Sequence, residues 1–166
     1  MPKKKKVASR DTRSRPILVP VDFSACSRAA LEFASELAPQ LRAELMVLHV
    51  VHDPGEAPGY YHVKGRKKQF RKLEDVAQHM LEEFMAGIVS EYPQRQQLKD
   101  AQRKLVVGLP VTRILQVVER VQPSMVVMGS AGRTGLSHIL LGSKAEQLVR
   151  LCPVPITIVK LPERSE

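Results

Sequence analysis

The stretch GSAGRTGLSHILLGS, residues 129–143, decides the fold that we expect of this chain. It follows an apolar run, residues 125–128, that is typical of a buried strand, and it precedes a helix-like run, residues 144–151. Because glycine has no Cβ, a loop with several glycines lets backbone N–H groups approach an anion closely. A strand, a glycine loop and the start of a helix are together typical of a phosphate-binding site.

Glycine-rich loops also have purely structural roles, because tight turns and helix C-caps use glycine as well. Composition alone leaves both interpretations open, but the spacing is more informative. Gly129 is followed after two residues by Gly132, and after nine more by Gly142 and Ser143. This spacing resembles that of nucleotide-binding members of the universal stress protein family. The sequences ILVPVDFS at 17–24, LHVV at 48–51 and VGLP at 107–110 are similar to the same family.

Length and composition favour one globular domain. The chain has 166 residues, of which 43% are hydrophobic, and this is enough to bury a core. No apolar run has the length of a membrane span, and the N-terminus lacks the hydrophobic segment of a secretory signal. We therefore expect a soluble, cytoplasmic protein. The two cysteines are far apart and form no C-x-x-C pair, so we expect structural roles for both.

The basic residues are concentrated at the N-terminus. Residues 1–15 hold seven basic residues and one acidic residue, which accounts for +6 of the net charge of +9. We expect 1–15 to be a disordered basic tail, 16–162 to be the folded domain and 163–166 to be a short C-terminal tail. The tail also resembles a nuclear-import signal and is able to attract nucleic acid or anionic lipid. It has no aromatic residues for base stacking, so we consider nucleic acid an unlikely partner.

Apolar runs and helical patterns alternate along the domain. We expect buried strands near 17–21, 44–51, 103–108, 125–128 and 154–161, with helices between them and a polar linker at 92–101. In the first helix, the predicted apolar stripe is Ala30, Phe33, Ala34, Leu37 and Leu41. This alternation predicts an α/β fold, an open parallel sheet with helices on both faces. Pro20 has no N–H to donate, so it must fall where strand pairing stops.

The family resemblance adds the topology. It implies a five-stranded parallel sheet in the order 3-2-1-4-5, Rossmann-like and similar to the adenine nucleotide alpha hydrolases. With this order the winding reverses between the first and fourth strands, and open sheets bind ligands at the carboxyl ends of strands at such a point. Asp22 and Gly129 flank that position. The resemblance therefore implies that both belong to one crevice.

The resemblance also implies a role for each residue of the site. Asp22 would bind the ribose hydroxyls or the adenine edge, Pro20 and Val21 would line the base, and Val50 would contact the adenine. The residues that would hold ribose and phosphates are Met128, Gly129, Gly132, Gly142 and Ser143.

The roles of Asp22, Arg133 and Lys144 have alternatives. Asp22 is also well placed to cap the entry of the first helix. Arg133 and Lys144 depart from the commoner family pattern or are variable in it; they would add cations beside the phosphates, or else pair with Glu146 or stay in solvent. Ser124 precedes its strand and should lie away from the ligand.

The implied function is that of an adenine-nucleotide-binding regulatory protein in the stress response, with ATP or AMP as ligand and Mg²⁺ as an optional companion. The first strand is not followed by G-x-G-x-x-G, and no G-x-x-x-x-G-K-[ST] pattern occurs, which disfavours dinucleotide cofactors and P-loop chemistry. The five histidines show no compact metal spacing. A slow ATP hydrolase is one alternative, and at most weak turnover is expected.

A second alternative is an interaction module with a vestigial pocket. Family members commonly dimerise through their last strands, and the apolar edge at 156–159 is suited to a homodimer of this kind. The long polar segment 52–65, with Tyr60, Tyr61 and His62, is either a lid over a ligand or a surface loop. His138 lies within the glycine loop and is placed to approach a phosphate.

Overall fold

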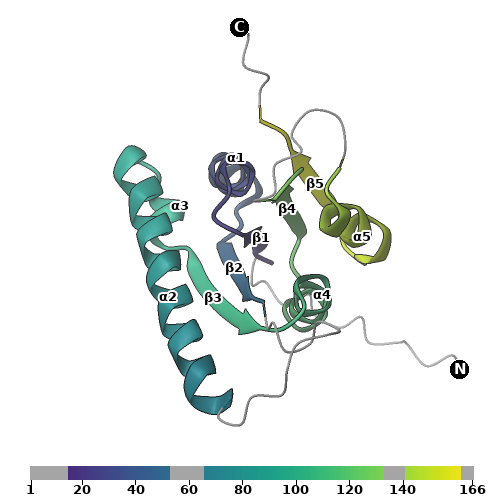
Figure 1. Ribbon diagram of the computed structural model, residues 1–166. Helices are drawn as coiled ribbons and strands as arrows, with labels where there is room; N and C mark the ends of the chain where they lie inside the picture. The colour runs from purple at the N-terminus through teal and green to yellow at the C-terminus, as the bar shows by residue number, and fades with distance from the viewer. Residues whose placement is uncertain (1–14, 53–65, 133–140, 162–166) are drawn as a thin grey trace, which may run out of the picture.

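Five parallel strands form one open sheet in this computed structural model, which describes residues 15–52, 66–132 and 141–161, with side chains from residue 73 onward in the second range. The strands are β1 (Ile17–Val21), β2 (Leu45–Val51), β3 (Gln102–Val107), β4 (Met125–Gly129) and β5 (Ile156–Val159). Their order is β3-β2-β1-β4-β5, and every neighbouring pair is parallel (Figure 1). The predicted fold class and strand order are confirmed.

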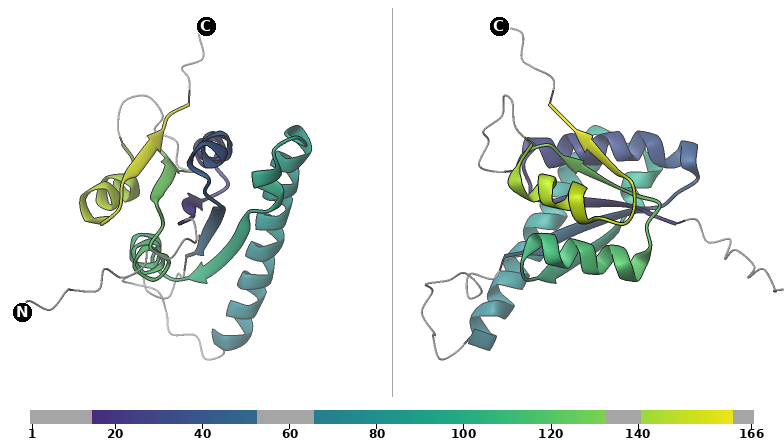
Figure 2. Two further views of the ribbon diagram at one scale, coloured as in Figure 1. Left: turned by 180° about the vertical axis from the view of Figure 1, so that it is seen from behind. Right: turned by 90° about the vertical axis from the view of Figure 1, so that its right-hand side faces the viewer.

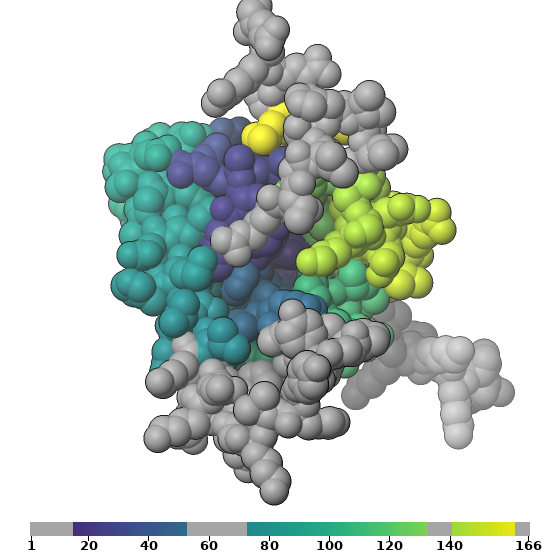
Figure 3. Space-filling model, in the orientation of Figure 1, coloured from purple at the N-terminus to yellow at the C-terminus, as the bar shows by residue number. Residues whose placement is uncertain are grey.

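Helices cover both faces of the sheet (Figure 2). The helices are α1 (Ala25–Leu41), α2 (Arg66–Glu91), α3 (Gln96–Lys99), α4 (Pro110–Val121) and α5 (Ser143–Leu151). The first three pack on one face and enclose one apolar cluster, and α4 and α5 enclose a second cluster on the other face. In the space-filling view α2 forms one side of the molecule and α5 the opposite side (Figure 3). Among the described helices, none has both the length and the apolar content that crossing a membrane requires.

The buried stripe of α1 differs from the predicted one. Ala30, Leu31, Ala34 and Ala38 are fully buried, whereas Phe33 and Leu41 are 41% and 50% exposed. The prediction was wrong for these two residues because two overlapping stripes of α1 have helical spacing. The stripe that faces the sheet is the one with small side chains, which lets the helix lie close to β1 and β4.

The predicted linker at 92–101 contains structure of its own. It holds the single-turn helix α3, whose Leu98 is fully buried. Before it, the guanidinium of Arg95 donates to the carbonyl of Glu32 at 3.1 Å and to the hydroxyl of Ser35 at 2.9 Å. One buried leucine and one anchored arginine therefore attach this segment to α1. A helix of a single turn is too short to show a hydrophobic period, so the sequence pattern did not indicate it.

Pro20 lies where the pairing of two strands ends, as predicted. The N–H of Ile17 donates to Glu44 just before β2, so alternation along the strand turns the backbone of residue 20 toward β4. The β1–β4 register covers only Ile17 and Leu18, while the register with β2 continues to Val21. The missing donor of Pro20 therefore costs no ladder hydrogen bond, and β1 and β4 separate toward their carboxyl ends.

We expect Leu31→Ala to destabilise the protein by about 2–5 kcal/mol, because it leaves a cavity in the cluster between α1 and the sheet. Phe33→Ala, on the exposed side of the same helix, should cost about 1 kcal/mol or less. Urea unfolding followed by circular dichroism measures both. A larger loss for Phe33→Ala than for Leu31→Ala would show that α1 packs through the stripe with the large side chains.

Candidate functional site

The candidate site lies where the winding of the sheet reverses, at the carboxyl ends of β1 and β4. The chain leaves β1 at Val21 and enters α1 within a few residues, and it leaves β4 at Gly129 on its way to α5. The N-termini of both helices therefore belong to connections that begin at this edge. This is the position at which open α/β sheets bind their ligands.

The two carboxylate oxygens of Asp22 differ in their hydrogen bonds. Its Oδ1 accepts the backbone N–H of Ser24 at 3.1 Å and the hydroxyl of Ser24 at 2.5 Å. Ser24 is itself the N-cap of α1, with its Oγ accepting the N–H of Ser27 at 3.1 Å. Asp22 thus organises the entry of α1 without being its cap, and its Oδ2 accepts no hydrogen bond within the described part of the chain.

Aromatic packing holds the backbone next to Asp22. Phe23 has a φ of 65°, in the left-handed region that is uncommon for residues other than glycine. Its ring lies 4.3 Å from the ring of His49 and 5.4 Å from that of Phe84, measured between centroids. Nδ1 of His49 is 2.8 Å from the carbonyl oxygen of Val21. These contacts fix the turn on both sides of the carboxylate, and His49 is a packed strand residue.

Glycine is required at 129 and 132 by a lack of space. A Cβ on Gly129 would lie 2.7 Å from the carbonyl carbon and the Cβ of Cys26, in the first turn of α1. A Cβ on Gly132 would lie 2.7 Å from Oδ2 of Asp22. Neither glycine has a positive φ, so close approach is the reason at both positions. The second glycine thereby brings a loop backbone next to the unbonded oxygen of Asp22.

The first backbone N–H groups of α5 have no acceptor among the described residues. Its first intrahelical bond runs from the N–H of Glu146 to the carbonyl of Gly142, which is the N-cap and has no side chain to accept a bond. The N–H groups of residues 143–145 therefore lack an intrahelical acceptor. Since α1 is capped by Ser24 and α5 is uncapped, α5 is the better of the two helix ends for an anion.

The other predicted residues divide into three groups. Pro20, Val50 and Met128 lie on the sheet face that carries α4 and α5, with Val50 and Met128 in one apolar cluster. Lys144 is exposed in the first turn of α5, and Glu146 pairs instead with Arg150 at 2.6 Å. Arg133, His138 and the segment with Tyr60, Tyr61 and His62 lie outside the described residues.

Ser124 lies at the amino ends of the strands, away from the candidate site, as predicted. Its N–H and its hydroxyl both bond to the carbonyl of Pro16, which precedes β1, at 2.9 and 3.2 Å. This places Ser124 at the amino ends of the strands, and the candidate site is at their carboxyl ends. Ser124 is therefore a suitable control position for substitutions.

Sequence reasoning missed two contributors. Ser24 is the N-cap of α1, and its hydroxyl also holds the carboxylate of Asp22. Ser130 joins the loop to two elements, because its N–H donates to Val159 at 2.9 Å and its carbonyl accepts from Gly142 at 2.8 Å. The available signal for Ser24 was the Asp-x-Ser spacing, which is typical of an Asx turn. No signal in the sequence indicates the bonds of Ser130, because they are made by its backbone.

The described groups of the site are suited to binding a polar ligand. Within the residues that the structure describes, no group of three or more His, Cys, Asp or Glu side chains is arranged to hold a metal ion. The site offers a carboxylate oxygen, a row of helix N-terminal donors and one exposed ammonium group. These groups complement a ligand that has hydroxyl groups and an anionic end.

Fold and site together define a doubly wound α/β protein whose switch point carries an acidic side chain on one connection and a helix N-terminus without a side-chain cap on another. Residues 13–160 match the model of the universal stress protein family, so the chain belongs to that family. A universal stress protein of Methanocaldococcus jannaschii is 27% identical over 157 residues, which cover 91% of this chain and 85% of that protein.

Solved structures of the family share the fold. The universal stress protein UspA from Lactobacillus plantarum has a TM-score of 0.73 at 22% identity, and the match covers 90% of this chain and 100% of that one. A universal stress protein from Archaeoglobus fulgidus, solved in complex with dAMP, has a TM-score of 0.55 at 21% identity, with 89% and 99% covered. At these identities the likeness establishes the fold.

Gly129→Ala should destabilise the protein by at least about 2 kcal/mol, because the added methyl group meets backbone atoms of Cys26 that cannot move without shifting α1. Gly87→Ala is the matched control, since a Cβ there has no neighbour within 4 Å and α2 gains a better helix former. The control should stabilise by about 0.5–1 kcal/mol. Urea unfolding of both variants decides, and equal stabilities would refute the close approach.

Proposed function

We propose that the switch point, at the carboxyl ends of β1 and β4, binds an adenine nucleotide, ATP or AMP, and that the protein acts as a nucleotide-binding regulator in the stress response. One observation carries the proposal. The uncapped N-terminus of α5 and the unbonded Oδ2 of Asp22 both belong to loops that leave the carboxyl edge at the switch point. One is suited to phosphate and the other to hydroxyl groups.

Each end of the nucleotide has its own set of groups in this proposal. The N–H groups of residues 143–145, the hydroxyl of Ser143 and the ammonium group of Lys144 bind the phosphates, with Arg133 and the backbone of Gly132 beside them. Oδ2 of Asp22 accepts the ribose hydroxyls. Because Ser24 occupies Oδ1, the carboxylate is held with a single oxygen available, which orients the sugar.

The base is assigned to the strand ends. At the carboxyl ends of the strands the half-buried Val50 offers apolar surface, while the buried Pro20, Val21 and Met128 would contribute mainly their backbone. A flat apolar base with polar edges suits such a surface. The Archaeoglobus fulgidus relative, which was solved with dAMP, supports adenine as the base. Mg²⁺ would accompany the phosphates of ATP rather than occupy a protein site.

The identity of the resident nucleotide is tested first. Mass spectrometry of the small molecules released on denaturing freshly purified protein, followed by titration of ATP and AMP into the stripped protein, should recover or rebind an adenine nucleotide. Absence of both release and binding would refute the proposal. Phosphate release well above a protein-free blank, and lost in an Asp22 variant, would favour the slow hydrolase over the regulator.

Asp22→Asn should weaken ATP or AMP binding by about tenfold to a hundredfold, because an amide nitrogen replaces a carboxylate acceptor while an oxygen remains for Ser24. Gly132→Val should remove binding, since its side chain fills the space next to Oδ2. Isothermal titration calorimetry measures both affinities.

Ser124→Ala is the control for these variants, because it lies at the amino ends of the strands and should bind the nucleotide as the parent protein does. Removal of residues 1–15 should also leave the affinity intact, since we regard the basic tail as an appendage of a cytoplasmic domain. Unchanged binding by Asp22→Asn would contradict the assignment of the ribose.

We also propose a homodimer through β5, which is an edge strand of the sheet. The carbonyls of Pro155 and Val159 accept N–H donors from the β4 side, so alternation turns the backbone of Ile156 and Ile158 outward. The neighbouring Val149 and Leu151 are 49% and 61% exposed. An antiparallel second copy of β5 would satisfy this edge and cover these side chains.

Ile158→Pro should convert the dimer to a monomer, because proline removes an outward donor while leaving the bonds to β4 in place. Ile158→Ala is the matched control, because it shortens the side chain and keeps the N–H. Sedimentation velocity measures the mass of each. A monomeric parent protein, or a Pro variant that still dimerises, would contradict strand pairing at β5.

A further inference from the structure

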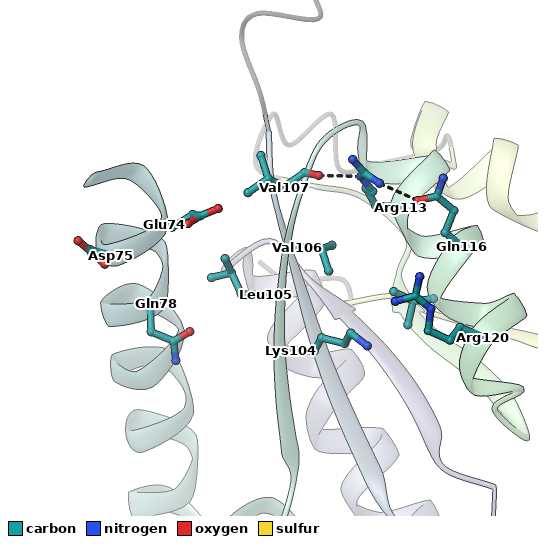
Figure 4. A pocket seen from close by; sticks show the side chains of 11 residues that line it. Glu74, Asp75, Gln78, Lys104, Leu105, Val106, Val107, Arg113, Gln116 and Arg120 are labelled. Carbon is teal, nitrogen blue, oxygen red and sulfur yellow. Dashed lines mark hydrogen bonds between the residues drawn. The ribbon is translucent and has the colours of Figure 1, made fainter. Parts of the chain in front are cut away.

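A groove of about 610 Å³ runs along β3, the edge strand on the side of the sheet opposite β5. It lies away from the switch point, and the nucleotide proposal assigns it no role. Its floor is the outer side of β3, one wall is the first half of α2, and the other wall is α4 (Figure 4). Leu105 points toward α2, and Val106 and Lys104 point toward α4. The groove therefore wraps around an edge strand and has access to both faces of the sheet.

The backbone of β3 presents unpaired groups to this groove. The N–H of Gly108 donates to Val51, which turns residue 108 toward β2 and, by alternation, turns residues 107, 105 and 103 outward. The outward carbonyl of Val107 confirms this, because it accepts Nε of Arg113 at 2.6 Å. The N–H and C=O of Leu105 have no hydrogen-bond partner among the described residues, so a donor and an acceptor at mid-strand remain available.

The α4 wall is basic. Lys104, Arg113 and Arg120 line it, and Lys104 extends toward Arg120 in the close view (Figure 4). Neither Lys104 nor Arg120 forms an ion pair with any residue that the structure describes. The α2 side has the half-buried side chains of Leu105 and Val107 on its floor and the exposed carboxylates of Glu74 and Asp75 on its wall. Thus one face of the edge favours negative charge, and the other offers apolar contact beside two carboxylates that repel negative charge.

We propose that the β3 edge binds an extended peptide in which acidic residues alternate with apolar ones. A peptide added to an edge strand directs successive side chains to opposite faces of the sheet. Acidic side chains at every second position meet Lys104, Arg113 and Arg120, and the apolar ones between them pack on Leu105 and Val107. The backbone of the peptide pairs with Leu105.

A second copy of this chain does not fit the same edge. Pairing β3 with its own copy about a twofold axis keeps like faces together, so Lys104 and Arg120 of one molecule would meet those of the other. Like charges facing each other across a strand pair are destabilising. The charge of the wall therefore selects an acidic partner over self-association.

The test uses fluorescence anisotropy with a labelled, end-blocked peptide of about ten residues in which glutamate and valine alternate. The control peptide has the same composition with its glutamates in one block. The alternating peptide should bind at least about tenfold more tightly, because only it places all of its charges on one face. Equal binding of the two peptides would overturn the proposal, since charge alone would explain it.

Variants of the protein separate backbone pairing from charge. Leu105→Pro removes the outward N–H and should lower the affinity by at least about tenfold, while Leu105→Ala keeps the N–H and should lower it by about threefold or less. The double variant Lys104→Gln and Arg120→Gln should lose about tenfold, and the loss should shrink as salt is added.

Circular dichroism verifies that each variant is folded. Binding by Leu105→Pro that matches the Ala variant would overturn strand addition, and binding by the double Gln variant that matches the parent would overturn the acidic preference. Self-association that disappears in Leu105→Pro would assign the edge to a second copy and would also overturn the proposal.

Discussion

The structure depends on the contact between Gly129 and the first turn of α1. The end of β4 and the start of α1 approach so closely that no Cβ fits between Gly129 and the backbone of Cys26. The small residues of α1, with Ala30 and Ala34 fully buried, let the rest of the helix follow the same line along the sheet. The position of α1 then sets the turn at Asp22, and with it the spacing across the switch point.

Asp22, at the turn that this contact positions, uses its two carboxylate oxygens differently. Asp22 contributes to the entry of α1 through Oδ1, and it has a second oxygen left for a ligand. The strained backbone at Phe23 is tolerated because its ring packs between His49 and Phe84. The same few residues therefore set the local fold and, in the proposed site, the position of the ligand, so we expect substitutions here to alter both.

Sequence patterns were sufficient for the strands, because buried parallel strands are apolar runs, and the family resemblance implied their order. They were also sufficient to place Asp22, Gly129 and Gly142 at one edge. They failed where packing selects between similar alternatives, as for Phe33 on α1, or where one side chain anchors a segment, as Leu98 does in α3. The bonds of Ser130 were unpredictable because any residue has the same backbone groups.

The two edges of the sheet differ in a way that limits assembly size. An α/β sheet with two self-complementary edges would add copies at both ends and grow into a fibre. Here β5 is apolar along its edge, whereas β3 carries Arg103 and Lys104 and has the carbonyl of Val107 covered by Arg113. With the β5 pairing that we propose, growth through sheet edges would stop after one pairing, so the assembly would close as a dimer instead of extending into an open-ended polymer.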